Sequence, residues 1–392
     1  MLNIIKEKVF SDARLTPEEG VWLLKNGSLL DLAEMAEHRR YQHNQQSRVT
    51  FVIDSNPNYT NVCNIDCIFC AFYRHEGDAD AYTYSVDQMI EKFKGAAKRG
   101  VRTILLQGGV NPGIPFDYYL DIVRRTRAEV PTIHPHFFST SEIIGMSEVS
   151  GLSIPEVLQQ LYNVGLNSIP GGGAEILSDR VKKKISNKKG TSEDWLMVMR
   201  EAHKIGYKST ATMMYGHLET DEDIVEHLES VRKLQDEYQG FTAFIPWSFK
   251  PGNTPLEKII STYASGTRYL EMIAFSRIYL DNFQHIQASW FSEGKKTGQM
   301  ALHFGADDFG GTIEDENVHA SANFVHTTSV KEMVDLIRDA GFTPAERTTL
   351  YDIVDEYAEG QYPEAVLNSA RLEHHINADI ILPTLAVMGQ AT

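Results

Sequence analysis

The three cysteines of the chain, Cys63, Cys67 and Cys70, lie within a stretch of eight residues. An odd number of thiols this close together does not form an ordinary disulfide framework. Three thiolates on one short loop readily converge on a soft metal centre. A structural zinc ion would need a fourth protein ligand, for which His75 is available. A 4Fe-4S cluster would keep one iron without a protein ligand, and that iron could bind a small molecule.

Glycines follow two predicted strands at positions where a ligand could approach the backbone. Gly108 and Gly109 follow one strand, and a turn is the alternative interpretation of this pair. The triplet 171–173 follows another strand and leads to Glu175, whose carboxylate could accept two hydrogen bonds from a ribose diol. Glu175 could instead be an acid at a helix N-terminus.

Candidate proton-transfer groups follow two further segments. His217 and Glu219 come after a predicted strand, and a histidine changes its charge near neutral pH. Glu219 could also belong to the start of the next helix. Asp307 and Asp308 lie in the glycine-bearing segment 305–312, as candidates for a general base or for binding substrate hydroxyls. Paired carboxylates also occur in ordinary solvated loops.

Polar residues at another predicted strand favour the lining of a chamber. His134 and His136 point to the same face of a strand, because side chains alternate along it. Two histidines alone make a weak metal site, so we interpret them as polar lining. Ser139 and Ser141, just beyond the strand, offer hydrogen bonds to a cofactor.

The elements that must position these groups alternate between strand and helix. Strands are predicted at 49–54, 102–107, 132–138, 166–169, 207–213, 241–246 and 285–290. Helices are predicted at 86–99, 116–129, 154–164, 192–205, 221–238 and 262–281. This alternation indicates repeated βα units and a parallel sheet of the α/β class. A doubly wound open sheet also fits, but polar residues after several different strands favour a TIM-like (β/α) barrel, partial or complete.

The predicted barrel covers residues 46–290 and has a helical segment on either side. Residues 1–45 form an N-terminal helical segment, where Thr16 caps a helix that has Pro17 at its first position. Residues 291–392 form a C-terminal extension packed on the barrel, with helices at 331–340 and 363–373. No linker justifies dividing the chain into independent domains.

The composition and net charge of the chain limit which kinds of molecule it is expected to bind. The chain has 392 residues, of which 42% are apolar, and its formal charge is 37 − 53 = −16. This charge argues against a nucleic-acid partner. The N-terminal residues lack the apolar run of a secretory signal, and no window approaches a membrane span. We therefore expect a cytoplasmic protein without a membrane span.

The cysteine loop resembles the CxxxCxxC signature of the radical S-adenosylmethionine superfamily, including the aromatic Phe69 before the third cysteine. The resemblance implies a (β/α) barrel, one 4Fe-4S cluster with three Cys ligands and one open iron, S-adenosylmethionine, and a 5′-deoxyadenosyl radical. It also implies that Phe69 lies near the adenine, although a ring that packs the loop onto the barrel is an equal alternative. Gly108 and Gly109 would contact the methionyl amino group, and Glu175 the ribose.

Further segments resemble the menaquinone-pathway branch that acts on futalosine derivatives, and within it the cyclic dehypoxanthine futalosine synthases. These segments are LQGGVNP at 106–112, GGGAE at 171–175, TATMMYGH at 210–217, FIPW at 244–247 and GADDFGGT at 305–312. The aminofutalosine synthases, which share the cysteine loop, are the alternative. An iron-sulfur electron carrier or a zinc-stabilised binding module is the alternative of another class.

The resemblance also implies a reaction and its partners. The adenosyl radical would take hydrogen from C4′ of the sugar of dehypoxanthine futalosine, and the sugar radical would add to the benzoate ring. Oxidation with loss of a proton would then restore the aromatic ring. An electron donor such as flavodoxin or ferredoxin would supply the reductant. Arg74, Lys250 and Arg277 are candidates for binding the substrate carboxylate.

Overall fold

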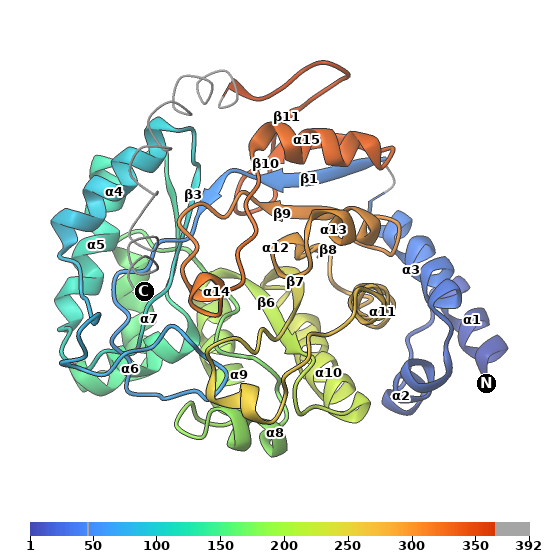
Figure 1. The fold of residues 1–392 in the computed structure, drawn as a ribbon, viewed down its shortest axis with the longest axis horizontal. Helices are drawn as coiled ribbons and strands as arrows, with labels where there is room; N and C mark the ends of the chain where they lie inside the picture. Colours follow the sequence, from blue (N-terminus) through green and yellow to red (C-terminus); the bar gives the residue numbers. More distant parts are fainter. Residues whose placement is uncertain (45–46, 365–392) are drawn as a thin grey trace, which may run out of the picture.

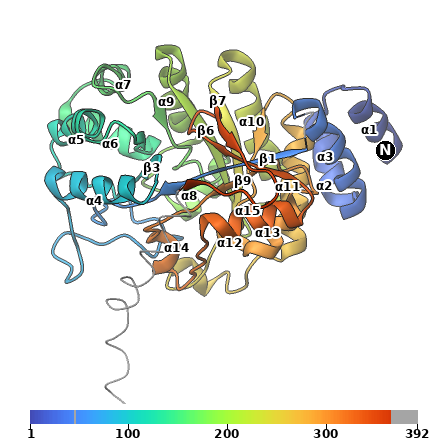
Figure 2. The ribbon, with the colours of Figure 1, turned by 90° about the horizontal axis from the view of Figure 1, so that it is seen from above.

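The computed structural model describes residues 1–44 and 47–364 and shows parallel strands surrounded by helices (Figure 1, Figure 2). Its barrel strands are β1 (Arg48–Val52), β2 (Asp54–Ser55), β3 (Thr103–Leu106), β4 (His134–Phe137), β5 (Ser168–Ile169), β6 (Lys208–Tyr215), β7 (Phe241–Ser248), β8 (His285–Ile286) and β9 (Asp308–Gly311). β2 continues the direction of β1. Parallel ladders join β9 to β1, β2 to β3 and β4, and β5 through β8.

Two junctions close these ladders into a ring. Between β8 and β9, Gln287 forms a parallel bridge with Asp308. Between β4 and β5, the rings of His134 and His136 lie 2.9 and 2.7 Å from the hydroxyl oxygen of Ser168. The strands therefore form a TIM-like barrel, which confirms the barrel over the open doubly wound sheet. The carboxyl ends of such strands meet at one mouth, where a site can be assembled.

The outer helices follow the strands in sequence. They are α4 (Val86–Lys98), α5 (Phe116–Glu129), α6 (Thr140–Ser150), α7 (Ile154–Asn163), α8 (Asp179–Ile185), α9 (Ser192–Ile205), α10 (Asp221–Tyr238) and α11 (Gly266–Tyr279). Capping boxes at Ser85, Thr191 and Thr220 begin α4, α9 and α10, because each cap hydroxyl accepts a backbone N–H that the helix leaves unpaired. Sequence analysis missed α6 and α8. The polar start of α6 resembles a loop, and α8 is short.

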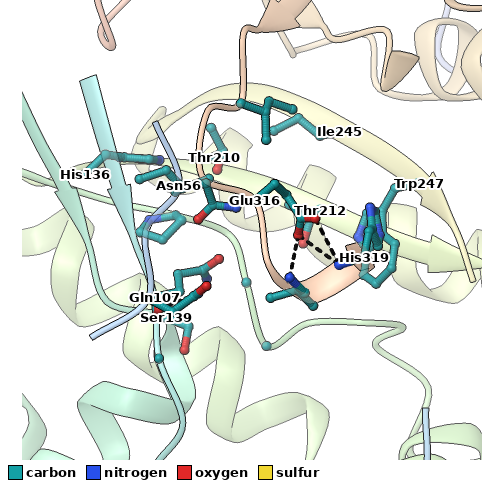
Figure 3. Close-up of a pocket in the computed structure, with 18 of the residues that line it drawn as sticks. Asn56, Gln107, His136, Ser139, Thr210, Thr212, Ile245, Trp247, Glu316 and His319 are labelled. Atoms are coloured by element: carbon teal, nitrogen blue, oxygen red, sulfur yellow. Dashed lines mark hydrogen bonds between the residues drawn. The ribbon is translucent and has the colours of Figure 1, made fainter. Parts of the chain in front are cut away.

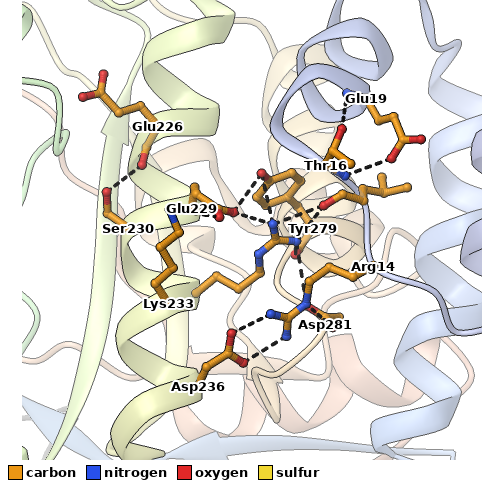
Figure 4. Close-up of polar contacts among 12 residues, drawn as sticks. Arg14, Thr16, Glu19, Glu226, Glu229, Ser230, Lys233, Asp236, Tyr279 and Asp281 are labelled. Atoms are coloured by element: carbon orange, nitrogen blue, oxygen red, sulfur yellow. Dashed lines mark hydrogen bonds and ion pairs between the residues drawn. The ribbon is translucent and has the colours of Figure 1, made fainter.

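The N-terminal helices are present as predicted. They are α1 (Leu2–Phe10), α2 (Pro17–Asn26) and α3 (Leu29–His43), and Thr16 forms a capping box at α2. Ion pairs attach the turn before α2 to the barrel helices (Figure 4). Arg14 donates to Asp236 at 2.5 and 2.9 Å and to Asp281 at 2.9 Å. This segment therefore lies on the outside of α10 and α11, away from the strands.

The segment after residue 290 differs from the predicted extension. A short 3-10 helix, η1 (Pro255–Lys258), precedes this segment. The segment itself contains, in order, α12 (Trp290–Glu293), α13 (Lys295–Ala301), β9, α14 (Val318–Ser321), α15 (Val330–Asp339), β10 (Thr343–Arg347) and β11 (Ile353–Glu356). β9 is a barrel strand, and β10 pairs with β1 in parallel, with Thr50 opposite Ala345. The predicted end of the barrel at residue 290 thus leaves out β9. Its sequence, DFGG, has low strand propensity and resembles a loop.

The remaining helix predictions have different outcomes. The helix predicted at 331–340 is α15, whereas the helix predicted at 363–373 lies outside the described residues beyond residue 364. Within residues 1–44 and 47–364, none of the helices combines the length and apolar character that crossing a membrane requires.

Candidate active site

A cavity of about 360 Å³ opens at the carboxyl ends of the barrel strands. Figure 3 shows side chains from opposite sides of the barrel pointing into it, among them His136, Thr212 and Trp247. The loops after β2, β3, β5 and β9 also contribute to its lining. Its size is in the range of small-molecule sites, and its place at the barrel mouth is where parallel barrels assemble active sites.

The three cysteines line one part of this cavity. Cys67 is buried, and Cys63 and Cys70 are partly exposed. Backbone hydrogen bonds hold the loop in place: Cys63 N–H donates to the Arg74 carbonyl at 2.9 Å, and Ile68 N–H donates to the Ile185 carbonyl at 2.9 Å. The loop is therefore fixed both to its own return segment and to the end of α8.

Gly108 and Gly109 allow the cysteine loop to pack against the end of β3. A Cβ at Gly109 would lie 2.1 Å from the Val62 carbonyl oxygen and 2.9 Å from Cys63 Cβ, and a Cβ at Gly108 would lie 2.7 Å from Tyr59. Both glycines line the cavity. Their N–H groups already donate within the protein, to Glu142 and to the Thr60 carbonyl, both at 3.0 Å. The sequence predicted that a ligand approaches this backbone closely, whereas in the structure the group packed against the two glycines is the protein's own segment at Tyr59, Val62 and Cys63.

The number and arrangement of the thiols bear on which metal group the cysteine loop could hold. Among the described residues, no group of three or more His, Cys, Asp or Glu side chains is arranged to hold one metal ion. A zinc ion needs such convergence, whereas the thiolates of a 4Fe-4S cluster bind separate irons. His75, the predicted fourth zinc ligand, is largely exposed and contacts Asp66 at 2.9 Å. Cys63, Cys67 and Cys70 are the residues that would hold the cluster.

Burial disfavours the thiolate form of two of the three cysteines. Burial raises the pKa of Cys67 to about 12, although the nearby Lys189 ammonium offsets part of this rise. Burial also raises the pKa of Cys70. Without a positive centre these thiols would remain protonated at neutral pH, and bound iron stabilises the thiolate form.

Glu175 faces the cavity together with a lysine that sequence analysis missed. Lys189 donates to Glu175 Oε1 at 2.7 Å, and both side chains are largely buried. The second oxygen, Oε2, is buried and has no hydrogen-bond partner among the described residues. An unpaired buried carboxylate oxygen is costly, so Oε2 is available to a hydroxyl donor in the cavity, which fits the predicted contact with a ribose.

Phe69 lies beside the same pair. The Lys189 ammonium is 5.4 Å from the centre of the Phe69 ring, within the range of a cation–π contact. Burial alone would lower the pKa of Lys189, but the Glu175 carboxylate and Cys67 in its thiolate form outweigh burial and raise it. Lys189 therefore carries a positive charge between the cysteine loop and Glu175.

Ser139 and Ser141 line the cavity as predicted, but Ser139 has a structural task as well. Its hydroxyl donates to Glu142 at 2.6 Å in the capping box that begins α6. Glu142 in turn accepts from the Tyr59 hydroxyl at 2.7 Å and from Gly108 N–H. This buried network holds the start of α6 against the cysteine loop.

His217 and Glu219 are not among the residues that line the cavity. The His217 ring contacts the Met214 carbonyl at 2.9 Å, and Glu219 accepts the N–H groups of Gly216 and His217 at 2.6 and 2.8 Å. Their imidazole and carboxylate lie 3.2 Å apart. The pair therefore fixes the turn between β6 and α10.

Asp307 and Asp308 also lie outside the cavity lining. Asp307 binds the buried Arg277 and accepts from Ile286 N–H at 2.8 Å. Burial would raise its pKa, but His285 and Arg277 outweigh burial and lower it. Asp308 is fully buried and pairs with Arg347. Both carboxylates stabilise β9 at the junction that closes the barrel.

The candidates for binding the substrate carboxylate lie elsewhere too. Arg74, Lys250 and Arg277 do not line the cavity. Arg74 pairs with Asp80 at 2.7 Å, and Lys250 lies 3.3 Å from Glu293. Cations that line the cavity are Lys189 and Arg347, of which Arg347 is paired with Asp308.

Other lining residues were missed because their role depends on tertiary packing. Asp54 at the start of β2 and the hydroxyls of Thr210 and Thr212 face the cavity. The two threonines also hold the glycine loop: Gly171 N–H donates to Thr210 Oγ1, and Thr212 Oγ1 donates to the Gly171 carbonyl, both at 2.9 Å. Threonine is common in β-strands for its strand propensity alone, so the sequence did not indicate that these two threonines line a cavity.

The opposite side of the cavity is aromatic. The His319 ring is stacked against Phe291 at 5.2 Å between centroids and lies 5.7 Å from Trp247. Burial lowers the pKa of His319 to about 3, so its ring is neutral. Figure 3 shows Glu316 beside it, bound to backbone N–H groups of α14. This side offers flat surfaces on which an aromatic ring could rest.

Comparisons with known proteins agree with this geometry. Residues 57–231 match the family model described as the radical SAM superfamily. Residues 238–359 match the model described as the CofH/MqnC C-terminal region. The two matches together span the barrel from the cysteine loop to beyond β9.

Curated relatives cover nearly the whole chain. It is 38% identical to a cyclic dehypoxanthine futalosine synthase of Halalkalibacterium halodurans, over 92% of this chain and 97% of that protein. It is 39% identical to a 5-amino-6-(D-ribitylamino)uracil--L-tyrosine 4-hydroxyphenyl transferase of Methanosarcina barkeri, over 91% and 96%. It is 36% identical to an aminodeoxyfutalosine synthase of Thermus thermophilus, over 88% and 94%.

Solved structures support the fold. The crystal structure of methylornithine synthase superposes with a TM-score of 0.68 at 18% identity, over 87% of this chain and 97% of that one. At this identity the likeness concerns the fold, which is again a TIM-like barrel.

Proposed function

The chain belongs to the radical SAM enzymes that carry the CofH/MqnC C-terminal region, and on this premise we propose that it converts dehypoxanthine futalosine to cyclic dehypoxanthine futalosine. In this reaction a hydrogen atom leaves C4′ of the sugar, and that carbon then bonds to the benzoate ring. The ring position that was attacked loses its hydrogen as a proton and an electron, and the ring becomes aromatic again.

The observation that carries the proposal is the end-to-end likeness to the cyclic dehypoxanthine futalosine synthases. The relative from Halalkalibacterium halodurans aligns over 97% of its length, and a second one from Streptomyces coelicolor aligns over 88% of its length at 38% identity. The segments 106–112, 210–217 and 244–247, whose sequences resemble those of these synthases, lie on or directly after β3, β6 and β7. These strands end at the cavity mouth.

The cysteine loop would hold the iron-sulfur cluster through Cys63, Cys67 and Cys70. When bound, the cluster supplies an electron to the sulfonium of S-adenosylmethionine, and the carbon radical so released can remove a hydrogen atom from a sugar. The cofactor would lie along Phe69, Lys189 and Glu175, because these residues line the cavity beside the cysteines. Glu175 Oε2 would accept a hydrogen bond from the ribose, and the ammonium of Lys189 would orient the carboxylate that makes this bond.

The rest of the cavity would position the substrate and exclude water. Ile245, Trp247 and Phe291 are apolar lining groups on one side, and a benzoate ring could rest against them. A carbon radical reacts with whatever lies nearest, so a fixed relative position of sugar and ring decides the product. The protein's contribution is therefore mainly orientation.

The experiment that tests this function is an anaerobic incubation of reconstituted, dithionite-reduced protein with S-adenosylmethionine and dehypoxanthine futalosine. We expect 5′-deoxyadenosine and a product that has lost two hydrogens relative to the substrate. If 5′-deoxyadenosine forms only with another substrate, the proposed function is wrong although the radical chemistry stands.

Two further reactions should be tested in the same assay, because relatives of comparable sequence identity are named for them. One is the aminodeoxyfutalosine synthase reaction, in which the adenosyl group would remain in the product; its substrate in the assay is an enolpyruvyl benzoate. The other is transfer of a hydroxyphenyl group from tyrosine to 5-amino-6-(D-ribitylamino)uracil. The masses of the products distinguish all three reactions.

A further inference from the structure

The proposed cyclisation ends with the loss of a proton from the benzoate ring, and this inference rests on that proposed function. A base must therefore reach the ring inside the cavity. The predicted bases His217, Glu219, Asp307 and Asp308 do not line it. Among the described residues, the carboxylates and imidazoles that do line it belong to Asp54, His136, Glu175, Glu316 and His319.

Two of the three carboxylates already have other roles. Glu175 is paired with Lys189 through Oε1, and its Oε2 is the oxygen proposed above to accept a hydrogen bond from the cofactor ribose. Glu316 accepts backbone N–H groups on both oxygens: Oε1 from Val318 and His319 at 2.8 and 2.9 Å, and Oε2 from His319 and Ala320 at 3.1 and 3.2 Å. A proton on either oxygen of Glu316 would compete with these bonds.

The two imidazoles are weak bases in this environment. Burial lowers the pKa of both His136 and His319 to about 3. The His136 ring is also engaged with Ser168 at 2.7 Å. Neither ring would hold a proton taken from the ring carbon at neutral pH.

Asp54 has a different arrangement. It is buried at the start of β2, and its Oδ1 accepts the Ile313 N–H at 2.7 Å. A Cβ at Gly311 would lie 2.2 Å from each of its carboxylate oxygens, so the carboxylate needs a glycine at this position of β9. No hydrogen bond to Oδ2 is formed within the part of the chain that the structure describes. The carboxylate is thus held by one oxygen and has the other free at the cavity wall.

We propose that Asp54 is the catalytic base that accepts the ring proton in the last step of cyclisation. The C–H bond of the attacked ring carbon breaks, its proton passes to Oδ2 of Asp54, and its electron pair enters the ring. The radical anion that results then gives one electron to a one-electron acceptor of the iron-sulfur or flavin class. The aromatic ring is restored and Asp54 is left neutral until it releases the proton to solvent.

The charges around Asp54 suit this role. Burial raises the pKa of Asp54 to about 6, and Glu314 raises it further, while the Ile313 N–H and Arg347 lower it. Arg347 comes from β10 and Glu314 from the segment after β9, so these are the charged groups facing Asp54 from the elements packed on β2. Most Asp54 side chains are ionised at pH 7, yet the pKa is close enough to neutrality for proton transfer in both directions.

The test compares Asp54→Asn with Glu314→Gln, which removes a nearby carboxylate that does not line the cavity. Each protein, loaded with its cluster, is given S-adenosylmethionine, reductant and substrate that carries deuterium at C4′. Deuterium in 5′-deoxyadenosine reports the radical step, and the ratio of cyclised product to 5′-deoxyadenosine reports completion. We expect deuterium transfer in all proteins, and a ratio about 100-fold lower in Asp54→Asn only.

Two further measurements separate a base from a binding group. Calorimetric titration with substrate, in the presence of S-adenosylmethionine but without reductant, should give a Kd for Asp54→Asn within about twofold of wild type. In wild type the product ratio should rise with pH around a midpoint of about 6. If Asp54→Asn fails to fold, two other measurements test the proposal. One is the pH profile of wild type, and the other is whether added formate restores the product ratio of Asp54→Ala.

The outcomes are distinct. An unchanged product ratio in Asp54→Asn, or a tenfold weaker Kd, would overturn the role of Asp54 as the base while the radical step remained intact. Absence of deuterium transfer in wild type would overturn the proposed function itself, and the role of Asp54 with it.

Discussion

The ammonium of Lys189 lies 2.7 Å from Oε1 of Glu175, in a buried ion pair beside the three cysteines. The pair links the turn after α8 to the loop after β5. It gives the cysteine loop a positive neighbour and leaves Oε2 of Glu175 free at the cavity. The relationship joins the two sequence motifs on which the cofactor site depends.

Replacement of Lys189 by methionine should destabilise the protein, because Glu175 would keep a buried charge without a partner. Breaking a buried pair from one side costs about 3 kcal/mol or more. Chemical denaturation should show this loss, and the double variant Glu175→Gln with Lys189→Met should recover part of it. Lys188→Met is the matched control, since Lys188 pairs with Asp66 at the surface and should cost less than about 1 kcal/mol. Equal losses for both lysines would contradict the buried pair.

Alanine at Gly109 should displace the cysteine loop without unfolding the barrel. Its Cβ would lie 2.1 Å from the Val62 carbonyl oxygen, which is closer than any real contact. We expect iron and sulfide per chain to fall several-fold after reconstitution, while circular dichroism stays unchanged. Gly95→Ala, in α4, should retain full iron content, because a Cβ there would meet only Arg99 Nη1, at an ordinary contact distance of 3.6 Å. Normal iron in Gly109→Ala would show that the loop does not depend on this glycine.

Asparagine at Asp307 should lower stability and spare the chemistry. Asp307 neutralises the buried Arg277, and the variant would leave that guanidinium unpaired, at a cost of about 3–5 kcal/mol. The melting temperature should drop, whereas 5′-deoxyadenosine formed per folded protein should match wild type at a temperature where both are folded. A selective loss of 5′-deoxyadenosine would place Asp307 in the reaction after all.

Asp54 should also have a measurable effect on pH-dependent stability. Its pKa is about 6 in the folded protein, above the ordinary value of 3.8. The folded state therefore holds the proton more tightly than the unfolded state, so this group destabilises the fold progressively as pH rises from about 4 to about 6. Asp54→Asn should remove a penalty of up to about 3 kcal/mol at pH 8 and change little at pH 4. Melting temperatures of the two proteins across this range measure the difference, and parallel curves would contradict the raised pKa.

The sequence was most informative where the chemistry is local. Cys63, Cys67 and Cys70 form their pattern within one loop, and the apolar strands that become β3, β6 and β7 are continuous in the chain. Glycine spacing likewise indicated close backbone approach at Gly109, and the structure shows what approaches it. These features need no knowledge of tertiary packing.

Features that depend on packing were not predictable in this way. Lys189 and Arg347 reach the cavity only because α8 and β10 are placed beside the strands. In the sequence, a lysine within a charged run predicts a solvent-exposed side chain. Asp307 and Asp308 resemble catalytic carboxylates in sequence, but β9 turns them toward buried arginines. A carboxylate has the same sequence signature whether it meets a ligand or an internal cation.

The presence of three cysteine ligands and one open iron is tested most directly by EPR of the reconstituted, dithionite-reduced protein before and after S-adenosylmethionine is added. We predict a 4Fe-4S signal that changes when the cofactor binds, because the open iron gains a ligand. A cluster signal that stays the same, or a protein that retains zinc and takes up no iron, would contradict this assignment.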